Sequence, residues 1–239
     1  MRKNKTLATA LILLGLAWLL PGCKNEPETF LGDYKYEYFP LDSGRYITYD
    51  VDSIYCYNDD GIKDTAYYQL KYEVGDTFYD NQNELSYEIS ISRRETTASP
   101  WVFYRKWYAK KIVTNAQQIE DDLRFIKLIF PPQQDATWNG NLYIASGNEP
   151  FLAYKNWESV YEGVDVPYTI NGFSFDSALL VTNVADSIFT YKHLRKEVYV
   201  KNLGMVYQEW EMKNKQEAGS WFAAKWKGFS LKMRMVEHN

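Results

Sequence analysis

Three stretches of the chain, residues 69–74, 85–92 and 229–235, alternate apolar and polar side chains one by one. A period of two places one apolar face against a core and one polar face in water, which is typical of antiparallel sheets. Aromatic and β-branched composition predicts further strands around residues 45–57, 101–111, 124–130, 175–184, 196–200 and 205–212.

Turn-forming residues separate several of these stretches. Asp60-Gly61, Asn171-Gly172 and Asn202-Leu203-Gly204 each lie between two strand-like runs. Asn, Asp and Gly accept the positive φ angles of tight hairpin turns, so these positions predict hairpins. Pro131-Pro132 is expected to end the strand that runs through Phe130, because proline cannot donate to a strand ladder.

Helical patterning is sparse. The two candidates, residues 115–123 and 150–161, are short, and neither carries a secure apolar stripe. The pattern as a whole predicts one mainly β, antiparallel domain, either a sandwich or a strongly curled sheet that forms a partial barrel, with one or two short helices.

The chain begins with a segment of a different kind. Arg2, Lys3 and Lys5 precede the uncharged stretch 6–20, which contains a long run of Leu, Ile and Ala. An apolar core of about 15 residues fits a secretory signal and is short for a membrane span of about 20. We therefore expect a secretory signal peptide.

The end of this segment, Leu20-Pro21-Gly22-Cys23, resembles the lipobox of bacterial lipoproteins, although Pro21 stands where a small or β-branched residue is commoner. The resemblance implies diacylglyceryl transfer to Cys23 and cleavage between Gly22 and Cys23. Residues 1–22 would then be removed, 23–33 would be a lipidated cysteine and tether, and 34–239 one globular domain. Two or three acyl chains hold a protein firmly at a membrane. The alternative is an uncleaved anchor helix with a chance cysteine.

The residues that follow Cys23 indicate the membrane in which the protein would reside. Lys24 follows the cysteine, where an aspartate would resemble an inner-membrane retention signal, and Glu26 and Glu28 are similar to surface-export signals of some lipoproteins. We expect an outer-membrane lipoprotein of a diderm bacterium. Its orientation, toward the cell surface or the periplasm, stays open.

Charge and cysteine content narrow the function classes. Removing 22 of 239 residues leaves 217, and the loss of three cations with the leader takes the formal charge from −4 to −7. An acidic chain repels phosphate backbones, which argues against nucleic acid. With Cys23 lipidated, Cys56 cannot form an internal disulfide. Between Tyr55 and Tyr57 it is expected to be a buried apolar residue, the alternative being a reactive thiol.

Three segments in order resemble a group of bacterial envelope lipoproteins with no established activity. They are the opening 39–49, which reads FPLDSGRYITY and fits FPLxxG followed by an aromatic residue, the middle segment with WNGN at 138–141, and the late hairpin 197–206, which fits EvYxxxxGxV. Val200 and Asn202 replace the usual small residues of that hairpin. The resemblance implies a β-rich extracytoplasmic lipoprotein and says nothing about chemistry.

Catalytic and metal signatures are scarce. The two histidines, His193 and His238, form no HxH or HExxH motif, and CxxC, GxSxG and phosphate-loop motifs are absent. Sequence proximity of His193 to Asp186 and Ser187 does not make a triad. We predict no catalytic residue, no metal and no cofactor other than the covalent lipid on Cys23.

Aromatic residues make up 17% of the chain, with 21 Tyr and 8 Trp. Most are expected in the core, but exposed Trp and Tyr also stack on sugars or line apolar cavities. Trp221 and Trp226, which flank Ala223-Ala224-Lys225, are the candidate ligand contacts.

Three functional hypotheses follow. The leading one is a membrane-anchored lipoprotein with a non-enzymatic binding or structural role in the envelope, its ligand a glycan, a lipid or a protein. The second is a periplasmic lipid-handling protein with an apolar cavity inside a curled sheet. The third is a glycosidase, for which Glu209 and Glu211 on one strand face would be the first residues to test.

Overall fold

The computed structural model describes residues 32–56, 63–147, 150–215 and 225–239. Tyr34–Asn239 forms one compact unit, and the following description concerns that unit. Its elements are η2 (Tyr36–Tyr38), β1 (Tyr46–Cys56), β2 (Lys63–Tyr79), β3 (Leu85–Arg94), β4 (Val102–Lys111), β5 (Asn115–Glu120), β6 (Leu123–Ile129), β7 (Thr137–Trp138), η3 (Leu152–Tyr154), β8 (Ser159–Ile170), β9 (Phe173–Ser187), β10 (Tyr191–Val200), β11 (Gly204–Lys215) and β12 (Trp226–His238).

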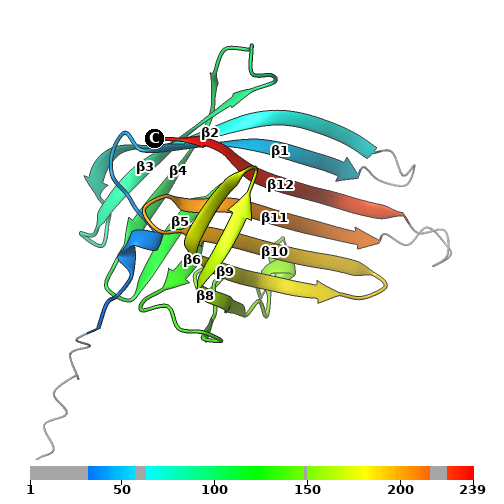
Figure 1. Cartoon of the computed structure of the whole chain (residues 1–239). Coiled ribbons are helices and arrows are strands. Elements are labelled where there is room, and N and C mark those ends of the chain that lie inside the picture. Colours follow the sequence, from blue (N-terminus) through cyan, green and yellow to red (C-terminus); the bar gives the residue numbers. More distant parts are fainter. Residues whose placement is uncertain (1–31, 57–62, 148–149, 216–224) are drawn as a thin grey trace, which may run out of the picture. The chain divides into compact units, whose positions relative to one another are not determined.

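All twelve strands belong to one sheet in the order β6-β5-β4-β3-β2-β1-β12-β11-β10-β9-β8-β7. Neighbouring strands are antiparallel throughout, and most are consecutive in the chain. The exception is the central pair, in which β12 pairs with β1 (Figure 1). The prediction of a mainly β, antiparallel domain is therefore confirmed, and of the two predicted architectures the strongly curled sheet is the one observed.

The two ends of this strand order meet, so the sheet nearly closes into a barrel. Ile126 of β6 donates its backbone N–H to the carbonyl of Gly140, just after β7, at 2.8 Å. Trp138 Nε1 donates to the carbonyl of Ile126 at 2.9 Å. The hydroxyl of Tyr161 on β8 donates to the Ile129 carbonyl at 2.7 Å and accepts from the Ile129 N–H at 2.9 Å. These bonds satisfy backbone groups that an open sheet edge would leave unpaired.

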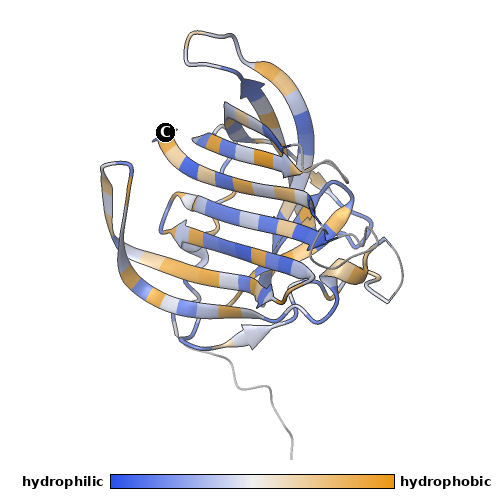
Figure 2. Cartoon of the chain, turned by 90° about the vertical axis from the view of Figure 1, so that its right-hand side faces the viewer, coloured by the Kyte–Doolittle hydropathy of each residue, from blue (hydrophilic) through white to orange (hydrophobic). Residues whose placement is uncertain are grey.

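Apolar side chains on one face of each strand fill the interior. Along β12, Met233 and Met235 are fully buried, as the alternation of residues 229–235 predicts. Tyr49, Tyr72 and Trp107 form a ladder across β1, β2 and β4, with ring centroids 5.2 Å and 5.4 Å apart and edge-to-face geometry. The colours along the central strands of Figure 2 show this alternation of apolar and polar residues.

The turn of the β8–β9 hairpin reaches β12. Asn171 and Gly172 take φ angles of 48° and 84°, which confirms the predicted tight turn. Asn171 Nδ2 donates to the Met235 carbonyl at 2.9 Å, and the ring of Phe173 lies 5.9 Å from that of His238. Register shifts within β8 bend the hairpin, and in Figure 1 it crosses in front of the central strands.

Other local predictions also hold. Asn202 and Gly204 have φ angles of 60° and 95° in the β10–β11 turn. Cys56 is a buried free thiol at the end of β1. The predicted Asp60-Gly61 turn lies outside the described residues, although β1 and β2 pair antiparallel on either side of it.

The two predicted helices are wrong. Residues 115–120 form β5, and Asp121 and Asp122, with φ angles of 47° and 69°, make the hairpin turn to β6. In residues 150–161, the part that the structure describes holds only the 3₁₀ turn η3 before β8 begins at Ser159. Without a continuous apolar stripe neither segment gains from helix packing, whereas pairing in the sheet satisfies its backbone. Among the residues described, no helix has the length and hydropathy to cross a membrane.

Candidate functional site

The interior of the sheet contains four charged side chains. Glu120 of β5, Lys127 of β6, and Arg195 and Glu197 of β10 are each at most 4% exposed. Strand alternation brings Arg195 and Glu197 to the same face of β10, and the curl of the sheet brings β5 and β6 to within contact of them. Two anions face two cations, so the cluster is electrically neutral.

Each carboxylate of this cluster is held by several donors. Arg195 Nη2 donates to Glu120 Oε1 and Oε2 at 2.9 and 2.8 Å, and its Nε donates to Glu197 Oε1 at 3.0 Å. Lys127 Nζ donates to Glu120 Oε1 at 2.8 Å and to Glu197 Oε1 at 2.5 Å. The Tyr199 hydroxyl donates to Glu197 Oε2 at 2.7 Å. All four carboxylate oxygens are therefore occupied.

The cluster also packs against aromatic rings. The Arg195 guanidinium lies 4.7 Å from the Phe125 ring centroid and 4.2 Å from that of Trp210. Burial opposes the charge of Glu197, but Lys127 and Arg195 outweigh it and lower the pKa of Glu197 to about 2. The space beside Phe125, Lys127 and Arg195 measures about 10 Å³, room for about one water. This arrangement joins the two halves of the sheet and leaves no space for a substrate.

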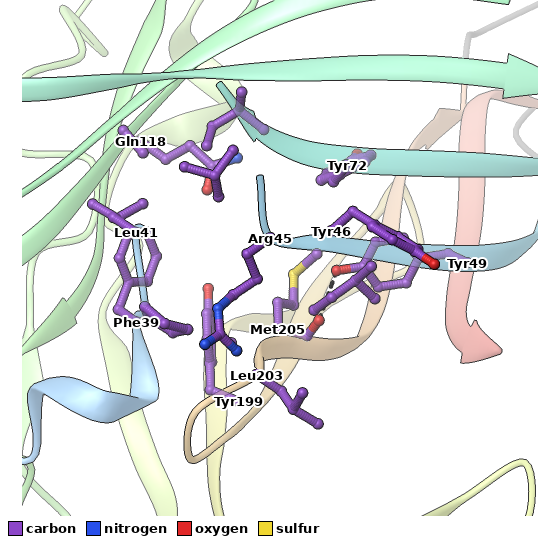
Figure 3. A pocket seen from close by; sticks show the side chains of 16 residues that line it. Phe39, Leu41, Arg45, Tyr46, Tyr49, Tyr72, Gln118, Tyr199, Leu203 and Met205 are labelled. Atoms are coloured by element: carbon purple, nitrogen blue, oxygen red, sulfur yellow. Dashed lines mark hydrogen bonds between the residues drawn. The ribbon is translucent and has the colours of Figure 1, made fainter. Parts of the chain in front are cut away.

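A small cavity opens at the end of the barrel where η2 and the β10–β11 turn lie. It measures about 90 Å³ and is lined chiefly by apolar and aromatic side chains. Figure 3 shows Arg45 projecting into the space between Phe39, Tyr199 and Leu203. The Tyr49 hydroxyl, which also lines it, is already engaged, donating to the Met205 carbonyl at 2.6 Å. We call this space the mouth cavity.

Arg45 is the cation of the mouth cavity. Its Nη1 donates to the carbonyl of Asn202, and its Nη2 lies 3.4 Å from Asp42 Oδ2. Its Nε is buried and has no hydrogen-bond partner among the residues described. A free N–H beside apolar walls suits the anionic end of a ligand whose other end is apolar.

A larger groove lies on the outer face of strands β2 to β6. It measures about 480 Å³ and is lined by three aromatic residues together with amide, hydroxyl and charged side chains. Binding sites for small molecules usually measure about 300–1,000 Å³, a range that includes this groove and excludes the mouth cavity. We call it the outer groove.

Of the residues predicted as sites, Cys23, Gly22 and Trp221 lie outside the described residues. Trp226 begins β12, is half-buried, and has Lys215 Nζ 5.0 Å from its ring. It lines neither the mouth cavity nor the outer groove.

The paired glutamates of β11 each have cations of their own. Glu209 accepts from the Tyr207 hydroxyl at 3.1 Å and forms an ion pair with Lys232 at 2.9 Å. Glu211 forms ion pairs with Lys192 at 2.6 Å and Lys213 at 2.7 Å. Both carboxylates are thus engaged in cross-strand pairs on the sheet.

His193 lies opposite Asp186 in the β9–β10 ladder. Its ring stacks on that of Tyr191 at 4.7 Å, and burial lowers the pKa of His193. The carboxylate of Asp186 accepts from the Tyr191 hydroxyl at 2.6 Å. In the described ranges no three His, Cys, Asp or Glu side chains gather in a group that could hold a metal ion.

Comparisons with known proteins assign no family to this chain. No family model matches the chain, and no curated protein matches it. A solved structure from Bacteroides fragilis, described as a candidate exported protein with YmcC-like fold, aligns over 83% of this chain and 98% of its own, with 11% identity and a TM-score of 0.38. A similarity at this level carries no functional inference.

Sequence reasoning missed the interior cluster and the outer groove. The signal for the first is Lys127, a cation inside the otherwise apolar run 125–130, together with Arg195 and Glu197 two positions apart. A charge at an inward strand position requires a buried partner. The outer groove has a weaker signal, since its residues are ordinary polar positions of alternating strands.

Proposed function

We propose that this chain is a lipid-anchored envelope protein whose β domain is a binding module without catalysis of its own. The observation that carries the proposal is the saturated interior cluster. The buried carboxylates of the interior, Glu120 and Glu197, spend every oxygen on Lys127, Arg195, Tyr199 and Gln208. Space for a ligand lies instead in the mouth cavity and the outer groove.

The anchor is supported by the lipobox-like sequence ending in Cys23. Cells expressing the full chain are labelled with a radioactive fatty acid, and the protein is followed in membrane and soluble fractions. Wild type is expected to carry label and to sediment with membranes, whereas Cys23→Ser is expected to lose both. Cys56→Ser is the matched control and keeps the label. Labelled Cys23→Ser would refute the anchor.

Protease treatment of intact cells then decides the side of the membrane. Loss of the domain from intact cells, with a periplasmic protein unharmed, indicates surface exposure, and protection until the outer membrane is opened indicates the periplasm. The binding role is refuted by hydrolytic turnover of a glycan or ester by the purified protein, if Glu209→Gln or Glu211→Gln abolishes that turnover in a folded variant.

The apolar walls of the mouth cavity favour a second candidate function, the handling of a lipid. At about 90 Å³ the cavity is far smaller than usual ligand sites, so it would take only the end of one acyl chain or a small amphiphile. Arg45 at its wall would bind the anionic group.

This second function is tested by solvent extraction and native mass spectrometry of the purified protein, and by titration with octanoate. Binding that is weakened by Arg45→Met, and unchanged by Arg93→Met, supports it. Arg93 is the matched control because it is a partly exposed arginine that pairs with Glu95 at 2.9 Å, away from the cavity. A clean extract together with no octanoate binding overturns it.

A further inference from the structure

The outer groove is built from five neighbouring strands. Residues directly opposite each other on antiparallel strands point to the same face of the sheet, so the strand register defines the floor of the groove. Two cross-strand rows make this floor. They are Phe78–Ser86–Lys110–Gln117 and Glu88–Tyr108–Ile119–Arg124.

The tip of the β2–β3 hairpin forms one wall. A register shift between Val74 and Thr77 bends β2, and Asp80 begins the turn. Asp80 Oδ1 accepts from the backbone N–H groups of Gln82 and Glu84 at 2.9 and 3.0 Å, which fixes the turn internally. The wall is therefore held in place before any ligand arrives.

Lys110 ties this wall to the floor. It is almost fully buried, and its Nζ donates to Asp80 Oδ2 at 2.7 Å and to Gln82 Oε1 at 2.8 Å. Arg124 Nη1 reaches the same Gln82 oxygen at 3.4 Å. The cations of the groove thus bind groups of the protein itself. Glu88, at the far side, is paired with Lys106 at 2.5 Å.

Three aromatic side chains stand along the groove. The rings of Phe78 and Tyr108 meet edge to face with centroids 5.5 Å apart, and both side chains are partly exposed. Tyr79 beside them is 69% exposed. The rings of Phe78 and Tyr108 fix each other and stay partly open, so they are suited to stack against flat, partly apolar ligands, and Tyr79 adds an exposed ring beside them.

One buried polar atom of the groove lacks a partner. Gln117 is 3% exposed, and its Nε2 donates to Asn115 Oδ1 at 2.9 Å. Its Oε1 has no hydrogen-bond partner among the residues described. A buried acceptor without a donor is unfavourable, and a ligand hydroxyl would supply the missing hydrogen bond.

We propose that the outer groove binds a neutral oligosaccharide, with Tyr79 and Tyr108 against sugar rings and Gln117 Oε1 accepting from a sugar hydroxyl. Exposed aromatic faces beside amides fit a ligand that is apolar on its ring faces and polar at its edges. A neutral ligand is indicated because both carboxylates of the groove, Asp80 and Glu88, are already ion-paired with Lys110 and Lys106. The remaining cation, Arg124, donates to the Gln82 amide oxygen and lies 5.5 Å from the Tyr143 ring. The inference gives the binding module of the proposed function a ligand class and rests on it for its biological role.

The test uses the mature chain without its lipid, residues 24–239, since the buried core residues of the described structure lie between Tyr38 and Met235. The protein is labelled with carbon-13 at isoleucine methyl groups and titrated with maltohexaose, cellohexaose, laminarihexaose and chitohexaose. We expect saturable shifts at Ile119, which lines the groove, and none at Ile47, which lines the mouth cavity. A hexamer of galacturonic acid is the anionic comparison and should bind more weakly.

Three variants separate binding from folding. Tyr79→Ala and Gln117→Met are each expected to weaken binding by roughly tenfold. Tyr67→Ala is the matched control, because Tyr67 is also 69% exposed but lies outside the groove, and it should bind as wild type. The melting temperature of every variant is measured first. Gln117→Met is expected to change it little, because the loss of an unsatisfied buried acceptor offsets the loss of the hydrogen bond to Asn115 Oδ1.

The outcomes distinguish this inference from the proposed function. No shift at Ile119 with any of the four neutral probes up to their solubility limits, tighter binding of the anionic hexamer, or full binding by Tyr79→Ala overturns the glycan groove and leaves the binding module standing. Glycan binding followed by hydrolysis of the probe has the reverse effect: the groove is upheld, and the non-enzymatic function fails.

Discussion

At the scale of single residues, the interior of this protein depends on a balance of charge. Arg195 touches two carboxylates and two aromatic rings and is fully buried. Replacing a whole buried ion-pair cluster by apolar residues can be neutral or stabilising, whereas removing one member leaves an uncompensated charge. The loss of stability on replacing one of these residues therefore depends on which charged partners stay buried.

Arg195→Met is expected to lower the free energy of unfolding by about 3–5 kcal/mol, because Glu120 and Glu197 would stay buried with one cation between them. Urea denaturation measures this. Arg234→Met is the control, since the Arg234–Asp52 pair is partly exposed, and it should cost about 1 kcal/mol or less. Equal losses in the two variants would contradict the assigned role of Arg195.

Acid should weaken the protein through Glu197. Lys127 and Arg195, against the effect of burial, lower its pKa from 4.5 to about 2. A lowered carboxyl pKa adds stability that is present above about pH 4.5 and is lost as the pH falls toward 2. We expect the free energy of unfolding to fall over this interval in wild type, and less steeply in Glu197→Gln. Parallel pH profiles from chemical denaturation would contradict this assignment.

At the scale of elements, two glycines with positive φ have different surroundings. Gly172 in the β8–β9 turn has a φ of 84° and open space where a Cβ would lie. Gly228 in β12 has a φ of 127°, and a Cβ there would lie 2.0 Å from the Met212 carbonyl oxygen. The first glycine is required only for its backbone angle, whereas the second also allows β11 and β12 to approach.

Gly172→Ala should therefore lower the free energy of unfolding by about 1 kcal/mol through backbone strain alone. Gly228→Ala should cost at least twice as much, because the β11 backbone must move. Thermal unfolding monitored by circular dichroism compares the two variants. A Gly228→Ala protein that melts with or above Gly172→Ala would show that the pairing tolerates the displacement.

Sequence patterning predicted most strands. It failed where the local pattern fitted a helix and a strand equally well. Residues 115–120 carry polar and apolar side chains in no clear period, so the segment was compatible with a short helix. What decides for β5 is tertiary: its ladders with β4 and β6, and the ion pair of Glu120 with Lys127. Nothing in the sequence of residues 115–120 itself predicts these partners.

The functional candidates were harder to predict for the same reason. The alternation of residues 85–92 correctly assigned Ser86 and Glu88 to a polar face, which is the floor of the outer groove. The bond from Lys110 to Asp80 joins positions 30 residues apart, and only the strand register places them together. Composition favoured Trp221 and Trp226 as ligand contacts, whereas the exposed aromatic residues of the groove are Phe78, Tyr79 and Tyr108.

At the scale of the whole molecule, side-chain bonds near β6, β7 and β8 hold the ends of the sheet together. The Tyr161 hydroxyl both donates to and accepts from Ile129, and Trp138 Nε1 donates to Ile126. Since β6 and β7 are the terminal strands of the sheet order, these bonds convert an open sheet into a nearly closed one. Closure excludes water from the charged interior and strengthens its ion pairs.

Tyr161→Phe should cost about 1–3 kcal/mol, because it removes both hydrogen bonds to the partly buried N–H and carbonyl of Ile129. We also expect faster hydrogen exchange at the Ile129 amide, with little change at the Met233 amide in the central strand β12. Urea denaturation and amide exchange by NMR measure the two effects. Unchanged exchange at Ile129 would mean that the sheet stays closed without this hydroxyl.

The position of β12 in the middle of the sheet affects how the molecule is made. The chain emerges from β1 onward, and each hairpin can pair as its second strand arrives, but β1 has no partner on its other side until residues 226–238 follow. Until then β1 and β11 are bare edges open to other chains. A product that stops short of β12 would be two half-sheets lacking the strand that joins them, easily recognised by proteases. A chain is thus expected to resist proteolysis only when it includes β12.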